Sequence, residues 1–93
     1  MLNLEEVFES FDDDFLKFEK VESKLNPRAD LCAFLLLDKL IPGTADMVSG
    51  GEHDGIWLDT DCDKLAEIAT EADILTLVRC GVRYEDDSLA MFV

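Results

Sequence analysis

The stretch VSGGEHDGIWLDTDCDKL, residues 48–65, gathers side chains of several kinds that could take part in chemistry. It holds five acids, the only histidine, the only tryptophan and one of the three cysteines of a chain of 93 residues. Such a set could form a calcium loop, a catalytic centre, or only the corner between a strand and a helix. The rest of the chain is needed to choose among the three.

A calcium loop is the first interpretation. Asp59, Asp61 and Asp63 match positions 1, 3 and 5 of an EF-hand loop, where alternating carboxylates converge on one cation. The sixth position of that loop requires glycine and the twelfth requires glutamate, but Lys64 and Thr70 stand there. The spacing of His53 and Cys62 matches no zinc pattern either. We therefore expect no metal site and no other cofactor.

Catalysis is the second interpretation. His53 could act as a general base, oriented by the carboxylate of Glu52 or Asp54. The sequence contains no GxSxG, no HExxH and no glycine-rich phosphate loop, and His53 falls in a predicted hairpin loop. We expect the protein not to be an enzyme.

The third interpretation is structural. Thr60, Asp61 and Asp63 can accept hydrogen bonds from backbone N–H groups at the start of a helix and complement its dipole. This leaves further acids without a local structural role, in the same stretch and elsewhere: Glu52, Asp54, Asp59, Asp12, Asp13, Asp14, Glu85, Asp86 and Asp87. We therefore expect the functional residues of this chain among these surplus acids.

The charge of the chain is extreme. Against 22 acids there are 8 bases, for a net charge of −14, beyond the magnitude of roughly 2 to 8 that keeps a small domain soluble. Such a field repels nucleic acid and anionic membranes and attracts basic surfaces. The sequence shows no signal peptide and no membrane span, and its three cysteines form no CxxC pair, as is typical of reduced thiols. We expect a cytoplasmic protein with a basic partner.

The periodicity predicts one α+β domain spanning residues 1–93, with the element order ααββααββ and an antiparallel sheet packed against helices. The first helix should begin after Asn3 and run continuously to about residue 24, although the three aspartates at 12–14 could break it. The second, with Asn26 as its N-cap, should be the buried central element, because apolar residues surround more than half of it. Hairpins are expected around residues 45–59 and 82–93, and helices capped by Thr60 or Asp61 and by Thr70 lie between them.

Two functions fit the surplus charge. In the first, carboxylates imitate the phosphates of DNA or RNA and occupy a basic groove on another protein. The residues expected to bind that partner are Glu52, Asp54, Asp59, Asp61, Asp63, Glu85, Asp86 and Asp87. The polar side of the first helix is a second candidate surface, with the acids Glu5, Glu9, Asp12, Asp13 and Glu19, but the lysines of the same segment dilute its charge. In the second, an apolar patch of Trp57, Met91 and Phe92 docks a partner or a second copy of the chain, as in an adaptor or a homodimer. Neither function involves direct binding of nucleic acid or a membrane.

Two segments carry a resemblance to known proteins: SGGEHDGIWLDTDCDKLAEIATEADI and LVRCGVRYEDDSLAMFV. Together, within residues 49–93, they resemble small, uncharacterised acidic proteins encoded by tailed bacteriophages and prophages. Such families usually have no assigned catalytic residues. The resemblance implies an accessory factor that binds and inhibits a host protein, for example of a CRISPR or restriction system.

Overall fold

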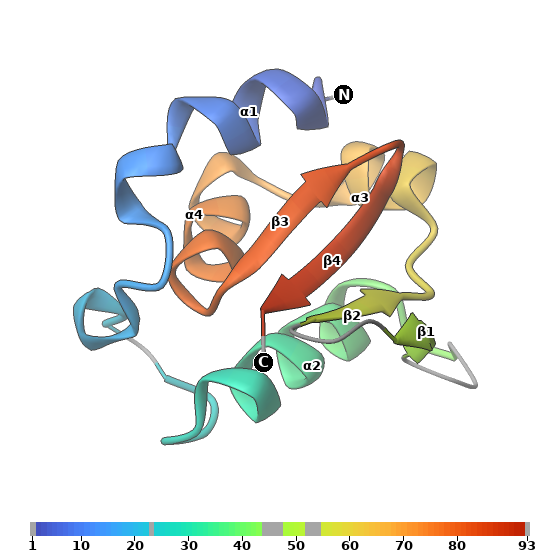
Figure 1. Ribbon diagram of the computed structural model, residues 1–93. Coiled ribbons are helices and arrows are strands. Elements are labelled where there is room, and N and C mark those ends of the chain that lie inside the picture. The colour runs from blue at the N-terminus through green and yellow to red at the C-terminus, as the bar shows by residue number, and fades with distance from the viewer. Residues whose placement is uncertain (1, 23, 44–47, 52–54, 93) are drawn as a thin grey trace.

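The computed structural model describes residues 2–22, 24–43, 48–51 and 55–92 (Figure 1). The elements are α1 (Leu4–Ser10), the 3-10 helices η1 (Asp12–Asp14) and η2 (Phe18–Lys20), α2 (Ala29–Leu40), β1 (Val48–Gly51), β2 (Gly55–Leu58), α3 (Cys62–Ile68), α4 (Glu71–Arg79), β3 (Val82–Glu85) and β4 (Ser88–Phe92). Apart from the 3-10 helices this is the predicted order ααββααββ. Among the helices of these ranges, none is long and apolar enough to cross a bilayer.

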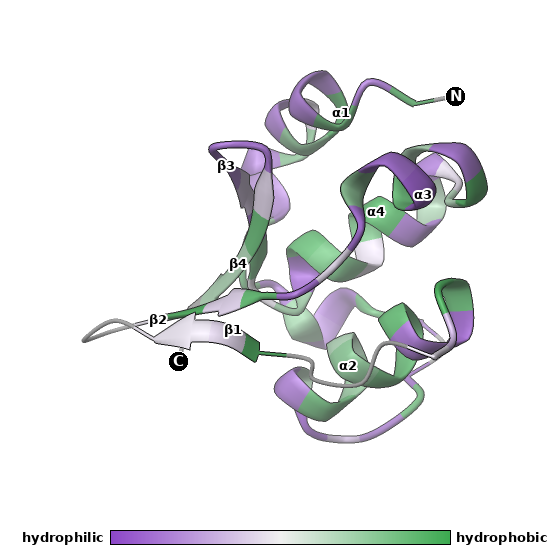
Figure 2. Ribbon diagram, turned by 90° about the vertical axis from the view of Figure 1, so that its right-hand side faces the viewer, coloured by the Kyte–Doolittle hydropathy of each residue, from purple (hydrophilic) through white to green (hydrophobic). Residues whose placement is uncertain are grey.

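The four strands form one antiparallel sheet in the order β1-β2-β4-β3. The helices lie on one side of this sheet, and the other side carries no helix (Figure 2). Met91 of β4 pairs with Ile56 of β2 and with Val82 of β3, so these three side chains share the face toward the helices. The α+β class and the antiparallel sheet packed against helices are therefore confirmed.

Helix α4 is the central helix of the domain, and the prediction that α2 holds this place was wrong. Helix α4 contacts α1, α2, β3 and both 3-10 helices, and its Ile74 and Leu77 are 0% exposed. Helix α2 packs by one face only and leaves Leu31 and Leu35 exposed. Its composition could not reveal this, because an apolar helix surface does not show whether its own chain covers it.

Three of the predicted helix starts are confirmed by their hydrogen bonds. The side chain of Asn3 accepts from the Glu6 amide at 3.2 Å, and that of Asp61 from the Lys64 amide at 3.2 Å. Thr70 caps α4 in a reciprocal capping box with Asp73. The start of α2 differs from the prediction: the N-cap is Arg28, and the Asn26 side chain accepts from the Arg28 amide at 2.9 Å in a turn before the helix.

The first helix is not continuous to residue 24 but ends at Ser10, and the chain then bends around the end of α4. Arg79 of α4 holds this bend, because its guanidinium lies 3.2 Å from the carboxylate of Asp14 and donates to the Lys20 carbonyl at 3.3 Å. The Leu16 amide also donates to the Val78 carbonyl at 3.1 Å. The adjacent aspartates favour such a turn, and the contacts with α4 stabilise it.

Gly81 makes the passage from α4 to β3 possible. Its φ is 98°, a conformation that residues with a Cβ atom rarely adopt. A Cβ atom at this position would also lie 2.7 Å from Cδ2 of Leu16. Leu16 itself has a φ of 65°, so two left-handed residues meet where the first segment crosses the end of α4.

Replacing Gly81→Ala should therefore lower the free energy of unfolding by about 1–3 kcal/mol, because alanine is strained at this φ. The contact with Leu16 adds little, because that side chain is 47% exposed and can turn away. Urea denaturation measures the change. Gly51→Ala is the matched control, since a Cβ atom at Gly51 meets no atom within 4 Å. Equal unfolding midpoints for the two variants would contradict the role given to Gly81.

Candidate functional site

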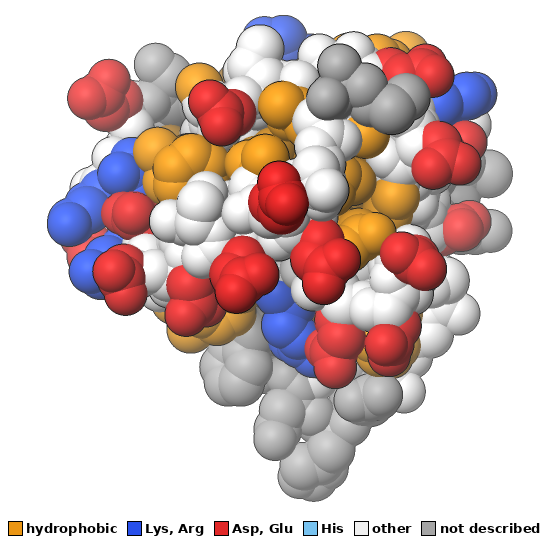
Figure 3. Space-filling model, turned by 90° about the horizontal axis from the view of Figure 1, so that it is seen from above, with side chains coloured by type: hydrophobic (Ala, Val, Ile, Leu, Met, Phe, Trp, Pro, Cys, Tyr) orange, Lys and Arg blue, Asp and Glu red, His pale blue; other side chains and the backbone are white. Residues whose placement is uncertain are grey.

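The structure gathers acids from three separate segments on one face of the molecule. Seen from the α1 end, acidic side chains cover much of this face (Figure 3). The acids that line its three hollows come from α1 and η1, from the start of α3 and from the β3–β4 turn: Glu5, Glu9, Asp12, Asp61, Asp63, Glu85, Asp86 and Asp87. We call these eight residues the acidic surface. The predicted clusters at 59–63 and 85–87 thus meet, except for Asp59.

Tyr84 of β3 lies at the centre of the acidic surface. It lines all three hollows, which measure about 280, 460 and 330 Å³. Its hydroxyl donates to Oδ1 of Asp87 at 2.9 Å, and its ring stacks on Phe8 of α1 with 6.0 Å between ring centroids. Tyr84 therefore connects the turn to α1.

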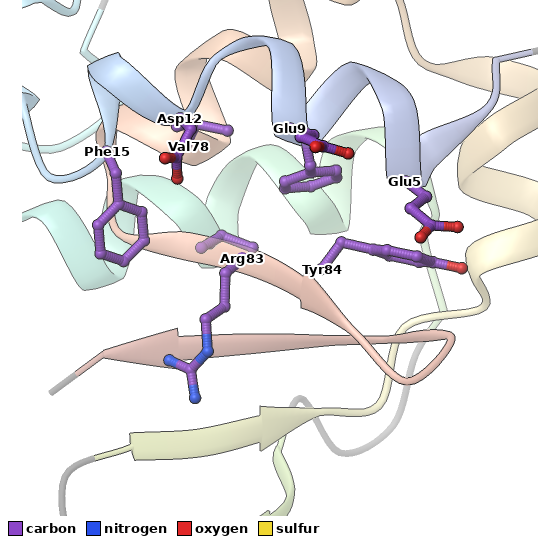
Figure 4. A pocket seen from close by; sticks show the side chains of 9 residues that line it. Glu5, Glu9, Asp12, Phe15, Val78, Arg83 and Tyr84 are labelled. Atoms are coloured by element: carbon purple, nitrogen blue, oxygen red, sulfur yellow. The ribbon is translucent and has the colours of Figure 1, made fainter.

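The hollow of about 280 Å³ lies between α1 and β3 (Figure 4). Its walls include the rings of Phe8, Phe15 and Tyr84 together with three carboxylates, from Glu5, Glu9 and Asp12. Arg83 also lines it, but its side chain extends away across β4 (Figure 4), where Nε lies 3.0 Å from the Glu85 carboxylate. A positively charged group could bind in this hollow, because the carboxylates would attract its charge and the rings would make cation–π contacts with it.

The pKa values of two groups beside the acidic surface, Tyr84 and Cys62, are raised. The pKa of Tyr84 is raised to about 12, first by the hydrogen bond to Asp87, then by burial, and then by the charges of groups that include Asp87 and Glu5. The pKa of the Cys62 thiol is raised by burial first and then by Asp61, Asp63 and Asp87. A raised pKa makes Cys62 a poorer nucleophile at neutral pH.

The β3–β4 turn that carries Asp86 and Asp87 is under conformational strain. These two residues have φ values of 52° and 58°, as in a two-residue hairpin turn of the kind that normally uses Asn-Gly or Asp-Gly. Two aspartates in left-handed backbone are less favourable than glycine. The hydrogen bond from Tyr84 offsets part of this cost, and the geometry directs two carboxylates to the tip of the hairpin.

One predicted binding residue, Asp59, is described by the structure but is not part of the acidic surface. Asp59 lines a different hollow, together with the basic Lys64 and the apolar Ile41 and Pro42. Glu52 and Asp54, and with them His53, fall outside the described residues. Glu5, Glu9 and Asp12 belong to the second candidate surface, the polar side of the first predicted helix, and were not included among the residues expected to bind the partner. The prediction missed Tyr84, for which the sequence holds no signal.

The apolar patch predicted from Trp57, Met91 and Phe92 does not form as expected. Met91 is 1% exposed and lies on the helix-covered face of the sheet, so its assignment to an interface was wrong. Trp57 pairs with Ala90 and lies on the opposite face, half-buried over Gly50. Alternation along β2 and β4 separates the two residues. The side chain of Phe92 is not described.

Within the described ranges, no three acidic, histidine or cysteine side chains are placed to hold a metal ion. The geometry of the acidic surface supports a different chemistry. Eight carboxylates share one face with a tyrosine hydroxyl and an aromatic hollow. Such a surface can bind several positively charged side chains at once.

Tyr84 is the only tyrosine, so absorbance at 295 nm follows its ionisation alone. We expect a midpoint near pH 12, and a fall toward 10.0, the ordinary value, in Asp87→Gly, which removes the acceptor but tolerates the positive φ. Because the folded pKa is the higher one, the hydrogen bond stabilises the fold fully below pH 10 and is lost as the pH approaches 12.

Asp86→Gly is the control for this titration, because it removes the same charge and the same strain from the turn without touching the Tyr84 hydroxyl. Its midpoint should stay near pH 12, as in the parent protein. A common midpoint for Asp86→Gly and Asp87→Gly would show that the hydrogen bond is not the main cause of the shift.

Cys62 reports the potential of the acidic surface, since Cys32 and Cys80 are buried. We expect the thiol to react slowly with the dianionic Ellman reagent and faster with the cationic disulfide cystamine, relative to a small free thiol. Salt should reduce this preference. Asp63→Asn should reduce it too, whereas Glu19→Gln on η2 should leave it intact. Equal preference in the protein and the free thiol would exclude a strong local field.

Comparison with known proteins gives this surface no assigned function. No family model, no curated protein and no solved structure matches the chain. The function has to be inferred from the chemistry of the acidic surface and of the hollows within it.

Proposed function

We propose that this is a non-enzymatic binding protein whose acidic surface occupies a basic, nucleic-acid-binding site on another protein. The observation that carries the proposal is the convergence of acids from α1, α3 and the β3–β4 turn around Tyr84. Duplex DNA presents one charge per roughly 3.4 Å along each strand. The eight carboxylates of the acidic surface likewise offer a basic groove several negative charges on one face.

The exposure of these acids supports the proposal. Most of the acidic surface is exposed, including Glu9, Asp63 and Asp86. Of the described residues that line its three hollows, Arg83 is the only base, and it is already paired with Glu85. The charge of the surface is therefore available to a partner and can steer a basic protein toward it.

The hollow beside Tyr84 supports the proposal that the partner is a protein, and not a layer of small dissolved cations. Phe8 and Phe15 offer ring surface, and Glu5 and Glu9 offer carboxylates around the same space. A lysine or arginine side chain of the partner fits this combination, because its charge meets the acids while its stem covers the rings. One inserted side chain would set the orientation of the complex.

The expected relation of residues 49–93 to acidic phage proteins leads to a proposal for the partner. We propose an accessory inhibitor of anti-CRISPR or anti-restriction type, which acts in the cytoplasm of a bacterial host on a protein that handles nucleic acid. Inhibition would follow from occupancy, because DNA or RNA and the acidic surface would compete for the same basic groove. The protein itself would bind neither nucleic acid nor a membrane.

The proposal is tested by capture from a bacterial lysate with the tagged protein, at low and high salt and with duplex DNA or RNA as competitor. We expect a nucleic-acid-handling protein that is released by salt and displaced by nucleic acid. The double variant Asp63→Asn, Asp86→Asn should weaken binding of the captured protein by about tenfold or more, measured by titration calorimetry.

The matched control is Glu19→Gln, Glu22→Gln, which removes the same charge from exposed positions outside the acidic surface. It should bind almost as tightly as the parent protein. Equal weakening by both double variants would mean that only the total charge matters. Capture that resists high salt and nucleic acid would contradict mimicry altogether.

A further inference from the structure

Helix α2 carries an exposed stripe that the acidic surface does not explain. Leu31, Leu35 and Asp38 follow one another at steps of four and three residues, so they lie along one side of the helix, and Arg28, the N-cap, stands three residues before Leu31. All four are exposed, and the two leucines are 40% and 45% exposed. We call these four residues the α2 stripe. Phe34, half-buried, lies beside it.

The opposite side of α2 packs against the core of the domain. Cys32, Ala33, Leu36 and Leu37 are buried toward the core. A helix that is apolar on almost every side normally has all its sides covered. Single exposed leucines are common on protein surfaces, but two leucines in one row, with an aromatic ring beside them, form a face on which a second helix could pack.

The α2 stripe lies in the least acidic part of the chain. Residues 17–39 contain five bases and four acids, whereas the remaining residues contain three bases and 18 acids. Helix α2 also lies at the opposite end of the molecule from α1, with α4 between them (Figures 1 and 2). A second copy that approaches at α2 therefore avoids the strongest repulsion between two chains of charge −14.

The order of residues along the stripe makes it complementary to itself. If two copies of α2 pack antiparallel with a two-fold axis between Leu31 and Leu35, at the level of Ala33 along the helix, then Leu31 of one copy lies opposite Leu35 of the other. The same register places Arg28 opposite Asp38. Each copy contributes a base at one end of the stripe and an acid at the other, with leucines between them. This arrangement buries the apolar centre and pairs both charges.

We propose that the α2 stripe is the interface of an antiparallel homodimer of this chain. The Arg28–Asp30 pair within one copy, at 3.1 Å, does not prevent it, because the side chains are 71% and 38% exposed and surface pairs of this kind are worth about 0–1 kcal/mol. An interface centred on one helix is smaller than the roughly 800 Å² per partner of standard complexes, so we expect a dissociation constant in the micromolar range.

The charge of the two copies is compatible with this dimer. The molecule extends 30 × 28 × 23 Å, so the two acidic surfaces would face away from each other, separated by several Debye lengths of about 8 Å at physiological ionic strength. Added salt should strengthen the dimer slightly, because it screens the remaining repulsion. Binding of a basic partner should weaken with salt, so the two associations can be distinguished. The homodimer does not depend on the proposed function.

Sedimentation equilibrium of the full chain tests the interface over a range of concentrations. We expect a monomer–dimer equilibrium in the parent protein, weakened by about tenfold or more in Leu31→Glu and in Leu35→Glu. Both leucines are exposed, so thermal unfolding of the variants should stay near that of the parent protein. Ile68→Glu, at another exposed apolar residue, is the matched control and should dimerise as the parent does.

Charge-reversal variants at the two ends of the α2 stripe test the antiparallel register of the two helices. Arg28→Asp and Asp38→Arg should each dimerise poorly alone, because like charges then face each other at both ends of the stripe. An equal mixture of the two variants should form a heterodimer, in which both ends are again oppositely charged, and the double variant should dimerise as the parent does. Failure of the mixture to associate would overturn the antiparallel register.

A parent protein that stays monomeric up to millimolar concentration would overturn the homodimer. The α2 stripe would then be a candidate binding site for a different protein. A dimer that Leu31→Glu and Leu35→Glu leave intact would overturn the assignment to α2 and place the contact on another face, such as that of Trp57. A dimer that salt dissociates would also contradict an apolar interface.

Discussion

The burial of α4 is the interaction on which the rest of this structure depends. Ile74 and Leu77 are completely enclosed, and α1, α2, β3 and the two 3-10 helices all contact this one helix. Hydrophobic burial of this kind is the main favourable term that can offset the self-repulsion of 22 acids. Because α1, η1 and β3 are each placed by contact with α4, the same packing brings the acids of the first segment beside those of the β3–β4 turn.

The acids divide into those that stabilise the fold and those that only add charge. Asp61 caps α3, Asp73 completes the capping box of α4, and Asp87 accepts the Tyr84 hydroxyl. Glu9 and Asp86 have no comparable role within the described hydrogen bonds. Asp61 and Asp87 belong to both groups, since they hold local structure and also face the hollows around Tyr84. Local structure and surface charge are thus built partly from the same side chains.

The two ends of the molecule differ in chemistry. At the α1 end, carboxylates from separate segments share one face, and under the proposed function a basic partner would relieve the repulsion among them. At the α2 end, charges are nearly balanced and leucines are exposed, so association there would be driven by apolar contact. Helix α4 separates the two ends and allows each to act without the other.

The sequence by itself determined the local features: the class and order of the elements, the antiparallel sheet, and the starts of three helices at Asn3, Asp61 and Thr70. These depend on periodicity and on hydrogen bonds between residues three or four positions apart, which a sequence displays directly. It also showed the excess of acids, although not their arrangement. The candidate site at 59–63 and 85–87 was therefore predicted only as two separate clusters.

Only the tertiary structure decided that these clusters meet at Tyr84, and that Glu5 joins them whereas Asp59 does not. It also decided that Met91 is buried and that α4, rather than α2, is the central helix. Each of these facts depends on contacts between distant segments. The hydrogen bonds of Arg79 to Asp14 and of Leu16 to Val78 turn the first segment across α4, and α1 then lies beside the β3–β4 hairpin. Residue types do not encode which distant surfaces will meet, because many pairings bury similar apolar area and packing selects one of them.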